Sequence, residues 1–180
     1  MSALDHLWAG WRAEFVGSAG PDSHHEKDAK KAQDAAGCVF CGLLASGLPD
    51  EQIHVVWRHG SGLVLAVLNA YPYTSGHLMV LPSRHVADLE GLEAEERAQV
   101  WEGVRAAVQA VKAAYKPQGV NLGANLGKAA GAGIPGHFHM HVVPRWGGDT
   151  NFMTAVADAR VLPEPLSESA TKLRRAWPPG

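Results

Sequence analysis

Residues 137–145 read HFHMHVVPR, and a glycine-rich segment, GKAAGAGIPG, precedes them at 127–136. Successive side chains of a β-strand point to opposite faces, so we expect His137, His139 and His141 to line one face of a strand. The apolar residues between them would then face a core. A row of imidazoles is costly to bury without partners. The pattern therefore favours a chemical site over ordinary packing.

The chemistry of such a row is suited to phosphorus. Imidazole has an ordinary pKa of about 6.5, so a neutral ring nitrogen is available as a nucleophile at pH 7. It can displace a phosphate leaving group and form a phosphoramidate, which a second acceptor then cleaves. The glycine-rich backbone offers N–H groups to phosphate oxygens. Zinc binding is the alternative interpretation, because His-x-His pairs chelate this metal.

A P-loop is excluded for the glycine-rich segment. The glycine spacing in residues 123–129, GANLGKA, differs from that of the motif, and neither Ser nor Thr follows Lys128. The predicted element after it is a strand rather than a helix. Phosphate binding here would have to rely on backbone N–H groups.

Length and charge limit the class of protein. The chain has 180 residues, enough for one domain with a hydrophobic core, and a net charge of -2. This charge gives no general reason to bind nucleic acid or a membrane surface. No segment approaches the roughly 20 apolar residues of a membrane span. Asp5, Arg12 and Glu14 lie where a signal peptide would need an apolar core, so we expect a cytoplasmic protein.

The hydrophobic periodicity divides the chain into a helical segment at 1–17, a polar linker at 18–36 and one domain at 37–180. Within the domain it predicts a long helix at 93–115, a short C-terminal helix at 168–177, and strands at 53–57, 63–68, 77–81, 120–125 and 137–143. This order contains no βαβ alternation. It indicates an α+β fold with a mainly antiparallel sheet.

Cys38 and Cys41 are the only cysteines, and they form a C-x-x-C pair. In a reducing compartment such a pair suggests metal or redox use rather than a structural disulfide. By itself it is half of a zinc site. Reduced cysteines that pack as small hydrophobic side chains are the alternative.

The spacing His-φ-His-φ-His-φ-φ at 137–143 resembles the signature of the histidine-triad (HIT) superfamily of nucleotidyl hydrolases and transferases. Further segments match in the same order: LWAGWR at 7–12, the C-x-x-C, LNAYPY at 68–73, GHLMV at 76–80, HVVPRW at 141–146 and GDTNF at 148–152. Together they look like the bacterial branch that includes diadenosine tetraphosphate phosphorylases. The resemblance runs from about Leu4 to the C-terminal helix, leaving only the linker without a counterpart. It implies the histidine-triad fold, a sheet of about five strands with one long helix and a short C-terminal helix.

The resemblance also implies roles for the histidines. His139 would be the nucleophile that attacks the α-phosphorus of a nucleotide and carries a nucleotidyl-histidine intermediate. His141 would hold the phosphate or the bridging oxygen, and His77 would buttress the triad. A polar residue at a strand end is the alternative interpretation of His77.

The activity implied first is a nucleotidyl transferase that converts diadenosine tetraphosphate and phosphate to ADP and ATP. The enzyme alternatives are hydrolysis of dinucleoside polyphosphates and hydrolysis of nucleoside phosphoramidates. A nucleotide-binding sensor is the alternative without catalysis. The expected ligands are therefore adenine nucleotides or dinucleoside polyphosphates.

A nucleoside pocket follows from the same resemblance. Asn69 stands where the family usually has an acidic residue that binds the ribose, and Leu68 and Tyr71 would flank the base. A simple turn at 69–72 would explain much of this segment. Asn125 matches an asparagine that contacts phosphate.

Departures and additions concern the loop and the end of the triad strand. Gly133 and Ile134 stand where many members have Gln followed by Ser or Thr, which favours orthophosphate as acceptor over simple hydrolysis. Arg145 is a candidate for binding the polyphosphate tail, and Trp146 is a candidate for stacking on the second base. Lys128, in the glycine-rich loop, is a further candidate for binding the substrate. A surface arginine and an interface aromatic are the alternatives.

A zinc site is implied where the family keeps the C-x-x-C pair. The ligands would be completed by His85 and by the first triad histidine, giving Cys38, Cys41, His85 and His137. Four protein ligands make a closed tetrahedral site, which is structural. No organic cofactor is implied. The family usually forms a homodimer with the long helices and strands at the interface.

Overall fold

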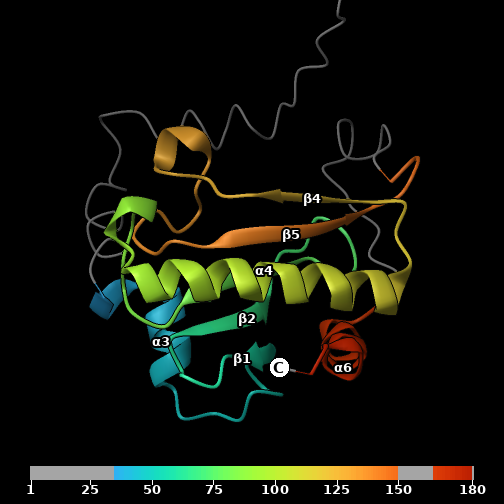
Figure 1. Cartoon of the computed structure of the whole chain (residues 1–180), viewed down its shortest axis with the longest axis horizontal. Helices are drawn as coiled ribbons and strands as arrows, with labels where there is room; N and C mark the ends of the chain where they lie inside the picture. Colours follow the sequence, from blue (N-terminus) through green and yellow to red (C-terminus); the bar gives the residue numbers. More distant parts are fainter. Residues whose placement is uncertain (1–34, 150–163, 180) are drawn as a thin grey trace, which may run out of the picture.

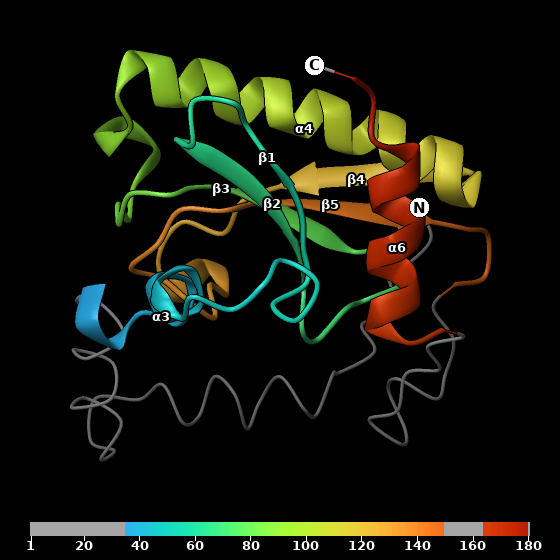
Figure 2. The same ribbon diagram turned by 90° about the horizontal axis from the view of Figure 1, so that it is seen from below.

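The computed structural model describes residues 35–149 and 164–179 (Figure 1). Its centre is an antiparallel five-stranded sheet in the order β1-β2-β3-β5-β4 (Figure 2). The strands are β1 (Val55–Arg58), β2 (Val64–Leu68), β3 (Leu78–Pro82), β4 (Gly119–Gly123) and β5 (Met140–Arg145). The predicted α+β class with an antiparallel sheet is confirmed. The helical segment expected at 1–17 and nearly all of the linker at 18–36 lie outside the described residues.

Three helices accompany the sheet within the described residues: α3 (Val39–Ala45), α4 (Ala94–Tyr115) and α6 (Leu166–Ala176). Short 3-10 turns lie at η1 (Ala35–Gly37), η2 (Leu89–Gly91) and η3 (Lys128–Ala130). Glu93 and Glu96 form a reciprocal capping box at the start of α4. Lys116, at φ 48°, ends this helix in the left-handed conformation before Pro117. None of the described helices combines the length and apolar character that crossing a membrane requires.

The helices cover the sheet on both faces. On one face α4 and α6 pack on a core that includes Val80, Val142, Phe138 and Met140. On the other face, Cys38, just before α3, and Phe40 of α3 form a second cluster with residues of β1, β2 and β3. Figure 2 shows α3 on the side of the sheet opposite α4. β2 and β3 lie between the two clusters, and every residue of both strands is accordingly buried.

The alternation predicted for the triad segment is present in space. Phe138, Met140 and Val142 enter the core beneath α4. The rings of His137 and His139 instead meet Phe40 of α3 edge-on, each at a centroid distance of 5.3 Å. The apolar and imidazole side chains therefore lie on opposite faces, as expected.

The predicted start of the triad strand at 137 is wrong, because β5 begins at Met140. β3 pairs with β5 over only three residues, ending at Val80↔Met140. Before that point the N–H of Phe138 donates to the Val86 carbonyl at 2.6 Å, in the connection that follows β3. This bond satisfies the backbone outside the ladder and bends the chain, so His137 and His139 stand just ahead of the strand.

Candidate functional site

The position of the proton on His139 follows from its hydrogen bond. His139 is buried, and its Nδ1 lies 2.8 Å from the carbonyl oxygen of His137. Since a carbonyl oxygen only accepts, Nδ1 carries the proton and Nε2 keeps the lone pair of the neutral ring. Burial lowers the pKa of His139 below its ordinary value, against the smaller raising effect of the His137 carbonyl. The ring is therefore neutral at pH 7, with a nucleophilic Nε2.

The protons of His77 and His141 follow in the same way. The backbone N–H of Tyr73 donates to Nδ1 of His77 at 3.0 Å, so the proton of a neutral His77 lies on Nε2. That Nε2 is 2.9 Å from Nδ1 of His141 and donates to it. His141 must then carry its own proton on Nε2. Burial, and then the neighbouring His139, lower the pKa of His141 to about 4, which keeps the ring neutral.

The two rings lie beside each other with opposite capacities. The centroids of His139 and His141 are 4.9 Å apart, at an interplanar angle of 76°. One ring offers a lone pair and the other an N–H donor. This pairing suits a displacement at phosphorus in which one oxygen gains negative charge.

Tyr73 is a residue of this site that the sequence reasoning missed. Its ring lies 4.6 Å from that of His77 and 6.2 Å from that of His141, and the side chain is 49% exposed. Thr74, the next residue, ties the same turn to β5 through a 2.9 Å bond from its Oγ1 to the Pro144 carbonyl. The usable signal was the place of Tyr73 in the segment LNAYPY, four residues before His77.

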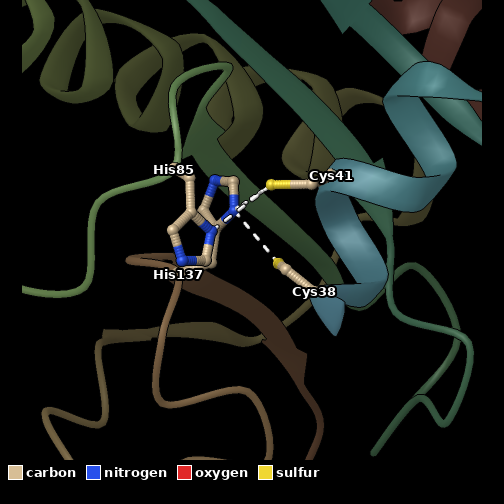
Figure 3. Close-up of side chains that lie close together, drawn as sticks. All are labelled: Cys38, Cys41, His85 and His137. Atoms are coloured by element: carbon tan, nitrogen blue, oxygen red, sulfur yellow. Dashed lines mark hydrogen bonds between the residues drawn. The ribbon is translucent and has the colours of Figure 1, made fainter. Parts of the chain in front are cut away.

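Four metal-ligating side chains gather at the other end of the triad segment: Cys38, Cys41, His85 and His137 (Figure 3). Their ligand atoms all lie within 4.8 Å of one another. Nδ1 of His137 is 3.4 Å from Cys38 Sγ and 3.6 Å from Cys41 Sγ, and Nδ1 of His85 is 3.3 Å from Cys41 Sγ. Zinc–ligand bonds of 2.0–2.3 Å in a tetrahedron put neighbouring ligands about 3.5 Å apart. The predicted set of residues thus forms a group that can hold a metal ion.

The protonation of this group agrees with a cation. Nε2 of His137 donates to the Pro82 carbonyl at 2.9 Å, which leaves the lone pair of Nδ1 facing the thiols. Burial, and then the neighbouring Cys38, raise the pKa of the Cys41 thiol to about 11. Two adjacent thiolates therefore require a positive charge between them. The donor types, their spacing and their orientation all fit a tetrahedral metal ion.

The residues expected around the nucleoside have different surroundings. Asn69 accepts the Tyr71 N–H on Oδ1 at 3.0 Å, and its Nδ2 lies 3.5 Å from Nδ1 of His77. Leu68 is buried in the core beneath α4, whereas Tyr71 is 87% exposed. Asn69 therefore holds a turn and also lies beside His77.

The loop before the triad is open at the position where the family pattern departs. A Cβ added to Gly133 would meet nothing within 4 Å, whereas Ile134 packs against the α3 cluster. Asn125 donates to the Gly131 carbonyl at 3.3 Å and so braces the loop. Lys128 is exposed in η3.

Arg145 and Trp146 belong to a local turn. The guanidinium of Arg145 donates to both oxygens of Asp149, at 2.6 and 2.8 Å, and to Asn121 at 2.8 Å. The N–H of Trp146 also donates to Asp149. Arg145 follows His141 by four positions along β5, about 13 Å at 3.3 Å per residue. The described hydrogen bonds of the Arg145 side chain and of the Trp146 N–H thus go to Asp149 of this turn and to Asn121 of β4.

Comparison with known proteins gives consistent results. The HIT domain family model matches residues 54–148. The protein named AP-4-A phosphorylase of Mycobacterium tuberculosis is 38% identical over 174 residues, which cover 97% of this chain and 85% of that protein. Protein hit of Bacillus subtilis is 30% identical over 118 residues, covering 66% and 77% respectively.

Among solved structures, a zinc-bound histidine triad family protein from Mycobacterium smegmatis superposes with a TM-score of 0.63. It is 30% identical, and the match covers 79% of this chain and 94% of that one. The sheet and helices described above are therefore shared over nearly the whole of that protein.

Proposed function

The chain belongs to the HIT domain family, and we propose that it cleaves diadenosine tetraphosphate by phosphorolysis, giving ADP and ATP. The observation that carries the proposal is the pairing of a buried Nε2 lone pair on His139 with an Nε2–H on His141. The similarity to a protein named AP-4-A phosphorylase over 97% of the chain supports the choice of substrate.

The first step is attack of His139 Nε2 on an α-phosphorus. The N–P bond forms, the bond from phosphorus to the bridging oxygen breaks, and ATP leaves. The leaving oxygen gains negative charge, and the N–H of His141 stabilises that charge by hydrogen bonding. The ring of His139 becomes positively charged in the adduct, where its Nδ1–H donates to the His137 carbonyl.

The second step returns His139 to its neutral state. An oxygen of orthophosphate attacks the same phosphorus, the N–P bond breaks, and the AMP group leaves on phosphate as ADP. Charge balances in both steps. The ring gains a positive charge when ATP leaves with the electron pair of the P–O bond, and it becomes neutral again when the electron pair of the N–P bond returns to Nε2. The open space at Gly133 supports a place for that anion.

The proposed place of the adenosine is against the turn at Asn69, next to His77. The Asn69 side chain, 3.5 Å from His77, offers an amide to the ribose hydroxyls without adding a charge. The exposed Tyr71, two residues after Asn69, is the proposed base contact. Leu68, the family's other base contact, is buried here in the core beneath α4 and is left out of the proposal.

Zn²⁺ is the proposed metal of the group Cys38, Cys41, His85 and His137, supported by the donor types and by the zinc-bound relative. Four protein ligands leave no open position for substrate, so the metal supplies cross-linking rather than chemistry. It would tie α3 to the triad segment at His137. Ligation by two thiolates also suits the reducing cytoplasm.

A homodimer is the proposed assembly. An apolar groove runs between the start of α4, the 3-10 turn η2 and the end of β4, with Trp101 (58% exposed), Leu89 and Leu126 among its lining residues. The edge strand β4 beside it also exposes Leu122. A patch of this kind favours burial against a second copy.

Product analysis tests the activity. The protein is incubated with diadenosine tetraphosphate, with and without orthophosphate, and the nucleotides are separated by chromatography. We expect ADP and ATP, formed only when phosphate is present. AMP and ATP without phosphate would make the protein a hydrolase, and no turnover in either condition would contradict both enzyme proposals.

A further inference from the structure

Gly76, the residue immediately before His77, has a tyrosine ring pressed against its backbone. A Cβ added to Gly76 would lie 2.6 Å from Cε2 and 3.0 Å from Cδ2 of Tyr115. Gly76 also has φ +79°, a conformation that side chains rarely adopt. Only glycine therefore allows Tyr115, the last residue of α4, to approach this closely.

The same turn orients His77 by its own hydrogen bonds. The N–H of His77 donates to the Thr74 carbonyl at 3.1 Å, and the N–H of Tyr73 donates to the His77 ring. Thr74 in turn binds the Pro144 carbonyl of β5. His77 is completely buried, so a shift of the turn would displace a ring that has no free space around it.

Tyr115 is itself held by a residue that lies just before the C-terminal helix. Its hydroxyl donates to Glu164, which also accepts a 2.6 Å bond from Ser169 Oγ and pairs with Lys172. The ammonium of Lys172 lies 5.7 Å from the centroid of the Tyr115 ring. Burial, and then the hydrogen bond to Glu164, raise the pKa of Tyr115, so its hydroxyl stays protonated. The ring thus has a fixed orientation against Gly76.

We propose that Tyr115 is a positioning residue that acts through Gly76 to set the place of the His77 ring, and through His77 the direction of the His141 N–H. The consequence for catalysis rests on the proposed function of His141. Glu164 and α6, which contribute no group to the histidine cluster, thereby take part in aligning it. The role belongs to the packing of the turn and requires no contact between Tyr115 and substrate.

Substitution of Gly76 separates this packing from backbone strain. Gly76→Ala places a methyl group against the Tyr115 ring, and we expect kcat to fall about 100-fold, the loss that a misplacement of about 1 Å produces. Gly62→Ala is the matched control, because Gly62 has φ +76° and nothing within 4 Å of an added Cβ. It carries the same strain without the contact, so Tm should fall while kcat is unchanged. An equal loss of kcat in both variants would overturn the proposal.

A double-mutant cycle tests whether the effect passes through Tyr115. Tyr115→Ala and Tyr115→Leu remove the ring, and in either background Gly76→Ala should lower kcat no more than Gly62→Ala does. Tyr115→Phe keeps the ring but loses the hydrogen bond to Glu164, and we expect its kcat to fall less than that of Tyr115→Ala or Tyr115→Leu. If the losses of Gly76→Ala and of the Tyr115 variants simply multiply, the two residues act independently and the proposal fails.

The ¹⁵N chemical shifts of the imidazole nitrogens give a readout that needs no substrate. We expect Gly76→Ala and Tyr115→Leu to change the shifts of His77 and His141, while Gly62→Ala leaves them as in the parent protein. Because this measurement is independent of turnover, a protein inactive on diadenosine tetraphosphate still tests the positioning role. Unchanged shifts together with a lower Tm would make Tyr115 merely structural and contradict the proposal.

Discussion

The first and last histidines of the triad segment use opposite ring nitrogens. His137 leaves Nδ1 for a ligand, whereas His141 leaves Nε2–H. At the metal group, His137 donates its Nε2 proton to the Pro82 carbonyl and turns a lone pair toward two thiols. At the proposed catalytic pair, His141 accepts on Nδ1 from His77 and keeps its proton outward. The difference arises from the hydrogen-bond partner behind each ring. His137 has a backbone carbonyl behind it, whereas His141 has a series of hydrogen bonds that begins at the Tyr73 N–H. Backbone polarity therefore decides which imidazole can bind a cation and which one can donate to an anion.

One residue joins the two regions. The side chain of His137 belongs to the metal group, and its carbonyl accepts the Nδ1 proton of His139. A change in the metal group is thus expected to reach the nucleophile through one backbone carbonyl.

The largest effect is expected from His139→Asn. The amide of asparagine keeps a donor toward the His137 carbonyl but offers no nucleophilic nitrogen, so kcat should fall on the order of 10⁴-fold. Metal content and Tm should remain near those of the parent protein, which separates the two regions. Steady-state turnover of diadenosine tetraphosphate measures the first effect. Retention of more than a few per cent of activity would show that another group is the nucleophile.

A smaller loss is expected from His141→Asn, about 100-fold in kcat, since a hydrogen bond to the leaving oxygen is weakened. The loss should depend on the leaving group. With the p-nitrophenyl ester of AMP, whose leaving group is itself a stable anion, the variant should lose much less activity. An equal loss on both substrates would mean that His141 does not act on the leaving oxygen.

Cys41→Ser tests the metal region. We expect loss of stoichiometric zinc and a fall in Tm of about 10 °C, equivalent to roughly 3 kcal/mol in a domain of this size. Activity should fall less than in His139→Asn, because the metal acts only through His137. Elemental analysis and thermal melts measure both effects, with Ser46→Ala, on the exposed C-cap of the same helix, as the control. Unchanged zinc content and unchanged Tm would show that Cys41 does not hold a stabilising metal ion.

The last prediction concerns the dependence of stability on pH. His141 has its pKa lowered to about 4, whereas in the unfolded chain it returns to the ordinary 6.5. Between these values the unfolded state binds a proton that the folded state refuses, so the free energy of unfolding declines as pH falls from 6.5 toward 4. Urea denaturation at several pH values should show this decline, with a shallower slope in His141→Asn. Equal slopes would mean that His141 is not held neutral.

Much of the site could be predicted from the sequence because its signals are local. Side-chain alternation placed the imidazoles opposite Phe138 and Met140, and this holds even though β5 starts only at Met140. The start of the strand depends on the bond from Phe138 to Val86, a partner 52 positions away that no periodicity indicates. Strand ends are decided by such distant partners.

Other features required the folded chain. The proposed metal ligands come from the N-cap and first turn of α3, from the connection after β3 and from the triad segment, and only the family resemblance had brought them together. The contact between the rings of Tyr73 and His77 depends on a turn whose shape the sequence does not reveal. Arg145 is different, because its partner Asp149 is only four residues away and was readable as a local pair.

Capture of the covalent intermediate tests the central claim most directly. The protein is mixed with diadenosine tetraphosphate in the absence of orthophosphate, quenched within the first turnover, digested, and examined by mass spectrometry under conditions that preserve phosphoramidates. The account predicts an AMP group on His139, present in the parent protein, absent in His139→Asn, and released as ADP when phosphate is added before the quench. AMP attached to another residue would contradict the account. Turnover without any adduct would also contradict it, if no AMP group is transferred back to added ATP either.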